Sequence, residues 1–322
     1  MPDIRDRAPG SPAVSADRTA ARTRLLAAGA AAATGVLVGS AIVATRVVVN
    51  QTGPGSLALL RYVIGFCCLL PPALAAARGV RFERRDLLPL ALLGITQFGL
   101  LIALLNYALR FIPSARAALL FATMPLLTML LGAALGRERV TAAKTAGVLL
   151  TIVGVALALG ERAIGAGAVS RAWTGGIAAL ASALCGAVCS VLYRPYLRKY
   201  PTLPVSAFAM LAAVAFLAVL AGGEGFFREP LRFTTDGWLA VLFIGANSGV
   251  GYYLWLWALG HAEPTRVTVF LALSPITAAA LGAWLLHETL SALALAGLGC
   301  VVAGLWIAHW RPAARSAVGR VV

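Results

Sequence analysis

Charged residues divide the chain into ten long apolar stretches. The stretches lack Asp, Glu, Lys and Arg, are 16 to 26 residues long, and begin after Arg24, Arg61, Asp86, Arg116, Lys144, Arg171, Lys199, Asp236, Arg266 and Glu288. A bilayer core of roughly 30 Å needs about 20 apolar residues, because a helix rises about 1.5 Å per residue. The pattern predicts ten transmembrane helices. The two shortest stretches, after Arg61 and Lys144, reach this length if the bordering cation lies in a helix end.

Composition and charge support this interpretation. Of 322 residues, 60% are hydrophobic and 12% are charged, against about 45–50% and about 25% in soluble domains. A soluble domain and a disordered chain are thus excluded. With a cytoplasmic N-terminus, Lys and Arg are roughly three times as frequent on the inside as on the outside. This bias predicts that both termini are cytoplasmic in a bacterial-type inner membrane. The net charge of +15 then reflects topology, and we expect no nucleic-acid partner.

The cysteines and histidines do not indicate a cofactor or metal site. All five cysteines lie in apolar stretches without CxxC spacing or a nearby histidine, so neither a disulfide nor a zinc site is expected. The first 24 residues form a polar tail, and the apolar stretch after them is longer than a signal-peptide core. We therefore expect the first helix to be retained.

The sequence also repeats itself at an offset of 150 residues. The paired positions include Gln97 and Asn247, Arg116 and Arg266, Pro125 and Pro275, Glu138 and Glu288, Gly147 and Gly297, and Gly154 and Gly304. This predicts a tail at 1–24, a first five-helix repeat at 25–160, an external linker at 161–172, a second repeat at 173–310 and a tail at 311–322. Five is odd, so equivalent helices cross the membrane in opposite directions, an arrangement typical of secondary transporters.

Several short segments recur in a characteristic order and spacing. They are Gly39-Ser40 with Arg46, Arg61, Asn106 to Leu109, Pro125, Gly136-Arg137-Glu138 with Gly147 and Gly154-Val155, Ala183 to Cys185, Tyr253 to Leu259, Pro275, and His287-Glu288 with Gly297 and Gly304. In these segments the chain resembles the EamA-type transporters of the drug/metabolite transporter superfamily. The resemblance covers nearly all of the chain outside its tails. It implies a ten-helix exporter or exchanger of small metabolites with a central cavity. The chain departs from the family at Val38 and Gly186, where tryptophan is frequent.

Two amides are the first candidates for binding substrate. Gln97 and Asn247 each lie ten residues inside their predicted span, which is about 15 Å and close to the bilayer midplane. A buried amide can orient a polar solute without burying a charge. Alternatively, each amide hydrogen-bonds a neighbouring helix. We add Asn106, from the segment that resembles the family, as a third candidate.

Span eight offers a stripe of further candidates. Ser248, Tyr252 and Trp255 follow one another at helical spacing beside Asn247, so they share one face. This face either lines a cavity or forms an ordinary helix interface.

Pro125 and Pro275 are predicted in mid-helix, where proline removes a backbone donor. They serve either as hinges or as interruptions at which the hydroxyl groups of Thr123 and Ser274 satisfy the freed backbone groups.

Charged residues near the span ends complete the candidate set. Glu138 and Glu288 precede Thr141 and Ser291, which are good N-cap residues, so the acids either stabilise helix ends or form gating salt bridges. Arg46 and Arg61 are expected to extend toward the outer interface, or else to attract an anionic solute.

We conclude from the sequence that the chain is an all-α transporter of small organic, amino-acid-like or drug-like solutes. It is not expected to be an enzyme, because no nucleophile, metal cluster or P-loop is visible. A non-transporting regulatory or structural membrane protein is the alternative. Substrate, coupling ion, direction and oligomeric state are not specified by the sequence.

Overall fold

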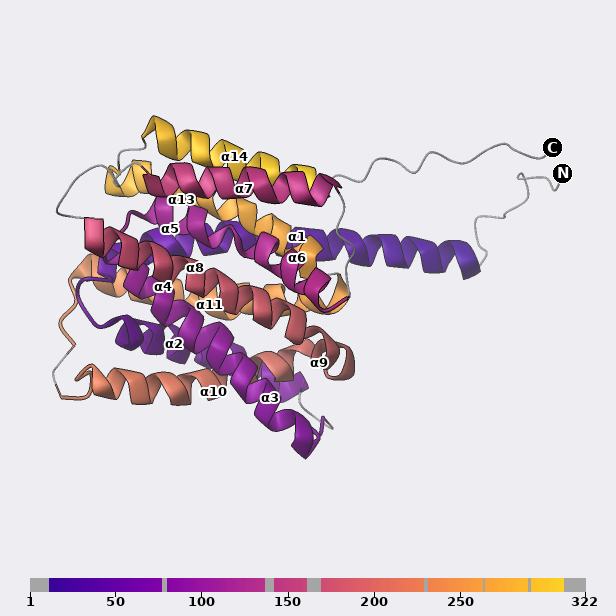
Figure 1. Ribbon diagram of the computed structural model, residues 1–322. Coiled ribbons are helices and arrows are strands. Elements are labelled where there is room, and N and C mark those ends of the chain that lie inside the picture. The colour runs from indigo at the N-terminus through magenta and orange to yellow at the C-terminus, as the bar shows by residue number, and fades with distance from the viewer. Residues whose placement is uncertain are drawn as a thin grey trace, which may run out of the picture.

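The computed structural model describes residues 12–76, 80–136, 142–160, 169–228, 231–262, 264–288 and 291–309. All regular secondary structure in these ranges is helical (Figure 1). The helices are α1 (Pro12–Val48), α2 (Pro54–Ala76), α3 (Arg84–Gly94), η1 (Ile95–Leu100), α4 (Leu101–Leu109), α5 (Ser114–Phe121), α6 (Met124–Ala134), α7 (Ala142–Gly160), α8 (Val169–Leu192), α9 (Arg194–Lys199), α10 (Thr202–Gly223), α11 (Thr235–His261), α12 (Pro264–Thr268), η2 (Val269–Ala272), α13 (Leu273–Leu286) and α14 (Ala292–His309). The candidate Glu138 lies outside the described residues.

Eight helical segments of the described chain are long and apolar enough to cross a membrane. They are Leu25–Val48, Pro54–Ala76, Arg84–Leu109, Ser114–Ala134, Arg171–Lys199, Thr202–Gly223, Thr235–His261 and Arg266–Leu286. Each coincides with one predicted span. The other two predicted spans coincide with α7 and α14, which are 19 and 18 residues long and pack along each other. The protein is thus an all-helical integral membrane protein.

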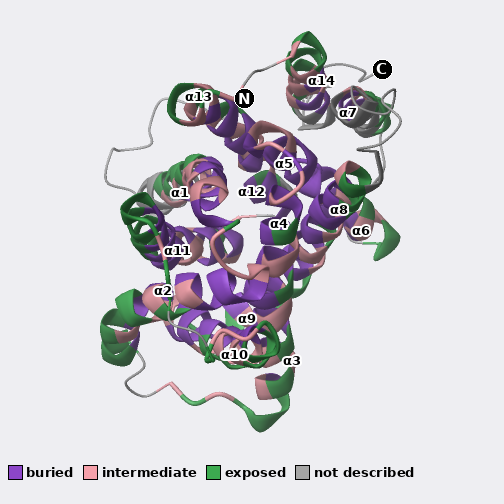
Figure 2. Ribbon diagram, turned by 90° about the vertical axis from the view of Figure 1, so that its left-hand side faces the viewer, coloured by how far each residue is buried: buried purple, intermediate pink, exposed green. Residues whose placement is uncertain are grey.

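Each half of the chain packs its first two helices against later helices of the other half. From the first half, α1 packs against α11 and α13, and α2 packs against α11. From the second half, the equivalent helices do the same: α8 packs against α4 and α6, and α10 packs against α3. The remaining major pairs, α2 with α10 and α7 with α14, join equivalent helices. Figure 2 looks along the bundle and shows buried residues concentrated in its middle, with α7 and α14 side by side at one edge.

Pro125 and Pro275 lie near the middle of the helical spans Ser114–Ala134 and Arg266–Leu286, as predicted, but each span changes just before its proline. α5 ends at Phe121 and α6 begins at Met124, so Pro125 lies in the first turn of α6. In the second half, the short 3-10 helix η2 precedes α13, and Pro275 lies in the first turn of α13. Proline is tolerated in the first turn of α6 because the N–H groups of a first turn have no partner within the helix.

A hydroxyl group donates to a backbone carbonyl just before each proline. Thr123 donates to the carbonyl of Leu120 at 2.8 Å, and Ser274 donates to the carbonyl of Leu271 at 2.7 Å. The second of these carbonyls is the one that Pro275 leaves without its usual donor four residues later. The structure therefore shows the backbone-satisfying alternative at Pro275, whereas Thr123 contacts a carbonyl other than the one that Pro125 leaves without a donor. A hinge role for the two prolines stays a prediction.

Candidate substrate cavity

A cavity lies at mid-depth in the bundle, and together with the space through which it opens to solvent it leaves about 580 Å³ unfilled by protein atoms. Both halves of the chain contribute to its lining. The lining residues are Thr34, Leu37, Val38, Ile42, Arg61, Gln97, Leu101, Ile102, Leu105, Phe121, Met124, Asn247, Ser248, Gly251, Tyr252, Trp255 and Leu271. A mainly apolar wall with a few polar groups is typical of small-molecule sites.

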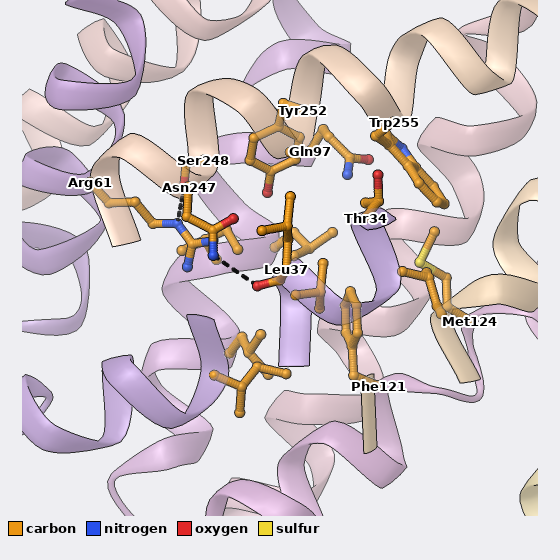
Figure 3. Close-up of a pocket in the computed structure, with 17 residues that line it drawn as sticks. Thr34, Leu37, Arg61, Gln97, Phe121, Met124, Asn247, Ser248, Tyr252 and Trp255 are labelled. Carbon is orange, nitrogen blue, oxygen red and sulfur yellow. Dashed lines mark hydrogen bonds between the residues drawn. The ribbon is translucent and has the colours of Figure 1, made fainter. Parts of the chain in front are cut away.

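One face of α11 forms a polar wall of this cavity. The predicted stripe of Ser248, Tyr252 and Trp255, with Asn247 beside it, lines the cavity along about two turns of the helix (Figure 3). Asn247 also donates its amide hydrogen to the carbonyl of Leu37 on α1 at 2.9 Å. The structure therefore places Asn247 in both predicted situations, in the cavity wall and in a bond to a neighbouring helix. Contact with substrate stays a prediction for this stripe.

Gln97 faces α11 from a π-helical turn. The third span changes from α-helix to the π-helix η1 at Ile95–Leu100, and this turn contains Gln97. Such turns insert a residue into the helical ladder and occur frequently at functional sites. The side chain is 4% exposed, and its carbonyl oxygen has no hydrogen-bond partner among the described residues. Trp255 is equally buried, at 3% exposed, and its indole N–H also has no partner there. Both groups remain available for a ligand.

Arg61 differs most from its predicted position. The helix that contains it begins at Pro54, so Arg61 lies seven residues inside the helix, or about 10 Å. It is 7% exposed, lines the cavity and donates its Nε–H to the hydroxyl of Ser248 on α11. The expectation that it extends toward the interface is wrong. The alternative, attraction of an anionic solute, is compatible with the observed position.

Asn106 lies outside the cavity lining. Its side chain is 1% exposed and donates to the carbonyl of Pro54 at 2.9 Å, at the start of α2. That carbonyl belongs to the first residue of the helix. The structure thus gives Asn106 the role of joining α4 to α2, and we withdraw it as a substrate ligand.

At one end of the bundle, an acidic residue of the second half caps a helix of the first half. Glu288 accepts hydrogen bonds from the backbone N–H of Ser114, at 3.2 Å, and from its hydroxyl. Ser114 begins α5, and a carboxylate at a helix N-terminus is favourable. Arg46 lies 3.8 Å from the same carboxylate and donates to the carbonyl of Leu109. Arg46 is therefore paired rather than extended alone to the interface. Glu288 stabilises a helix end, although that of α5 rather than of the helix that follows it, and a gating role for the ion pair stays a prediction.

Glu224 repeats this arrangement at the same end. It follows α10 and accepts hydrogen bonds from the backbone N–H groups of Gly55 and Ser56, at 2.9 and 2.8 Å, at the start of α2. The hydroxyl of Ser56 donates to it as well, at 2.7 Å. The charge pattern of the sequence did not single out Glu224, because it lies in a loop far from Gly55 in the sequence. We call the contacts of Glu288 and Glu224 the Arg46-end contacts.

At the opposite end, a cluster of charges joins α3 to the turn between α9 and α10. Lys199 contacts Asp86 at 2.6 Å and also pairs with Glu83, while Tyr200 donates its hydroxyl to Asp86 at 2.6 Å. The hydrogen bond from Lys199, assisted by the nearby Arg85, lowers the pKa of Glu83 below its usual 4.5. We call these the Lys199-end contacts. The cavity lies between the two sets of contacts.

Comparison with protein families gives a direct assignment. The model of the EamA-like transporter family matches the chain twice, at residues 25–160 and 173–310. The chain belongs to the EamA-like transporter family. Among the described residues, Val38 lines the cavity of this EamA protein, and Gly186 leaves room for Met124, whose sulfur would lie 2.6 Å from a Cβ at that position. Met124 thus occupies space that a side chain at position 186 would need.

Individual relatives are similar over most of their length. A "Probable terminal-alkyne amino-acid exporter" of Streptantibioticus cattleyicolor is 32% identical, over 84% of this chain and 88% of that protein. A "Probable amino-acid metabolite efflux pump" of Salmonella typhimurium is 28% identical, over 73% and 81%. A solved crystal structure matches with a TM-score of 0.65 at 26% identity, over 90% of this chain and 96% of that one.

Proposed function

We propose that this EamA protein is a secondary transporter that exports small amino-acid-like metabolites by alternating access. The observation on which the proposal depends is the cavity at mid-depth, lined by polar groups from both halves of the chain. Gln97 and Asn247 are paired by the internal repeat and both line it. Substrate sites of secondary transporters lie at such an interface between repeats, near the midplane. The names of the relatives support amino-acid-like solutes and the direction of export.

The proposal includes ten spans in two inverted five-helix repeats with cytoplasmic termini. Exchanged helix contacts support it: α1 packs on α11 as α8 packs on α4. The excess of Lys and Arg in the predicted inner loops supports the orientation. In this orientation the Arg46-end contacts lie on the outer side, and the Lys199-end contacts lie on the inner side.

Both sets of end contacts join the two halves of the chain. Glu288 and Glu224 reach from the second half to helices of the first half, and Lys199 reaches Glu83 and Asp86 of the first half. Opening either side of the cavity by moving the halves apart requires breaking the contacts on that side. A set of ion pairs and helix caps at each end is what alternating access needs, because each set favours one closed side.

In the part of the chain that the structure describes, no acidic side chain lines the cavity. A proton held by a buried carboxylate is therefore not part of the proposal. Exchange and coupling through other groups are both compatible with the cavity.

Efflux from proteoliposomes tests the proposal. Vesicles containing the purified protein are loaded with a mixture of amino acids, amines and small drug-like cations, and release is followed by mass spectrometry. We expect release of amino-acid-like solutes by the wild-type protein, and slower release by the double variant Gln97→Ala, Asn247→Ala. Leu242→Ala is the matched control, because Leu242 lies on the exposed face of α11. Unchanged release by the double variant, or no release of any solute by the wild-type protein, would overturn the proposal.

A further inference from the structure

Arg61 is a buried cation without a matching anion. Its residue surface is more than nine-tenths buried, in the interior of a membrane protein. No carboxylate among the described residues pairs with it; its one hydrogen bond in this part of the chain joins Nε to Ser248. The ring of Tyr62 lies 5.8 Å from the guanidinium carbon, but it is not an anion. A guanidinium has five N–H donors, so four of them have no protein acceptor there.

Such an arrangement is costly unless something else supplies the charge. Removing a cation from water without a partner is unfavourable, and buried charges in proteins are paired or hydrogen-bonded. Intramembrane ionisable residues usually face a cavity and mark a substrate pathway. Arg61 fits this description, because it lines the cavity rather than the lipid surface. The missing partner can therefore come from the ligand.

We propose that Arg61 is the carboxylate-binding residue of the cavity, so that the transported solutes are amino acids with an apolar side chain. This inference rests on the proposed function and specifies its substrate class. The planar fork of a guanidinium binds both oxygens of a carboxylate, which fixes the orientation of the ligand. Ser248 holds the Nε side of the fork, which leaves the two terminal nitrogens for the carboxylate.

The remainder of the cavity agrees with an apolar side chain. From Ser248 the wall of α11 continues for seven residues to Trp255, which is about 10 Å. Opposite this wall lie apolar side chains, among them Phe121 and Met124 (Figure 3). A carboxylate at Arg61 thus directs the rest of the solute toward an apolar region. There the unpartnered carbonyl oxygen of Gln97 accepts from a donor on the solute.

Paired probes that differ in one group test the role of Arg61. L-leucine and L-phenylalanine are compared with their amides, which lack the negative charge, and with the amines that remain after loss of the carboxyl group. Binding to the purified protein in detergent is measured by ligand-induced thermal stabilisation. We expect each acid to bind the wild-type protein on the order of 30-fold more tightly than its amide, the size of effect seen when a buried charge loses its partner.

Variants locate the effect at Arg61. Arg61→Gln should bind acid and amide equally, and Arg61→Lys should retain part of the preference because it keeps the charge but not the fork. Arg84→Gln is the matched control: it makes the same change at an exposed arginine in the first turn of α3, outside the cavity lining, so the acid should still be preferred. If Arg61→Gln does not fold, the difference in affinity between acid and amide on the wild-type protein still tests whether the cavity binds a carboxylate. Equal binding of acid and amide to the wild-type protein, or no binding of any probe, overturns the assignment.

The efflux assay keeps this result separate from the proposed function. Transport of amides and amines as readily as acids would support the proposed export function but overturn the role of Arg61. Binding of acids that depends on Arg61, without efflux of any solute, would support the carboxylate site and overturn the transporter.

Discussion

A Cβ atom at Gly154 would lie 2.7 Å from the carbonyl oxygen of Gly297, so α7 and α14 pack backbone against backbone at this point. The exchanged pair has the same relationship, because a Cβ at Gly304 would lie 2.6 Å from the carbonyl oxygen of Gly147. The repeat pairs Gly147 with Gly297 and Gly154 with Gly304. Each glycine of one helix thus faces the non-equivalent glycine of the other, as expected for two helices related by a two-fold axis.

Gly154→Ala should therefore destabilise the pair of helices. The added methyl group meets a backbone carbonyl that cannot turn aside, and overpacking costs about 1–3 kcal/mol. Gly299→Ala on α14 is the control, because nothing lies within 4 Å of a Cβ at that position. There alanine should be neutral or stabilise the helix by up to about 1 kcal/mol. Thermal unfolding in detergent measures both variants. Equal midpoints for the two would contradict the close packing.

The sequence was sufficient to predict where the apolar helices lie along the chain. Charge-free stretches mark the spans because a charged side chain in lipid is costly, and the spacing of Gly147 and Gly154 recurs at Gly297 and Gly304. The polar face of α11 was also predictable, since helical periodicity alone places Ser248, Tyr252 and Trp255 together. These features depend on local sequence and on the bilayer.

Features that depend on tertiary contacts were not predictable. Arg61 ends a charge-free stretch, yet Ser248 of the other half lets it lie deep within a helix. Asn106 is in a segment that resembles the family, but the partner of its side chain is the carbonyl of Pro54. The π-helical turn at Gln97 has no sequence pattern of its own. In each case the deciding contact comes from a distant part of the chain or from a change in the helical ladder.

Gln97→Ala should reduce transport without reducing stability. The carbonyl oxygen of Gln97 has no partner among the described residues, so removing the amide breaks no hydrogen bond at that atom and relieves an unsatisfied buried group. Asn247→Ala should reduce both, because it removes the bond to Leu37, worth about 1 kcal/mol. Efflux rates and unfolding midpoints of the two variants check this difference. A large loss of stability in Gln97→Ala would show that its amide is structural.

Glu288→Gln should open the Arg46 end of the bundle. The substitution removes the charge that caps α5 and faces Arg46, at a cost of about 1 kcal/mol. The population should therefore shift from the state that is closed at the Arg46 end toward the state that is open there. In a background without native cysteines, Ile42→Cys reports the opening, since Ile42 lines the cavity one turn from Arg46.

A membrane-impermeant thiol reagent added outside should modify Ile42→Cys faster when Glu288→Gln is present. Asp236→Asn is the control, because Asp236 is an exposed acid in the first turn of α11. Faster modification in the control as well would assign the effect to general loss of negative charge. No change in either variant would contradict a closing role for Glu288.

The Lys199-end contacts should weaken in acid. The hydrogen bond from Lys199 lowers the pKa of Glu83, so the folded protein holds this carboxylate ionised to lower pH than the unfolded chain does. Its stabilisation is fully present above the usual pKa of 4.5 and is lost as the pH falls through the lower value of the folded state. Glu83→Gln removes this dependence. The difference in thermal unfolding midpoint between wild-type and Glu83→Gln protein should be constant from neutral pH down to about 5 and should then shrink. Because Glu83 is partly exposed, 1 M salt should also reduce the difference at pH 7. A difference that grows as the pH falls would mean that Glu83 is not stabilised as a carboxylate.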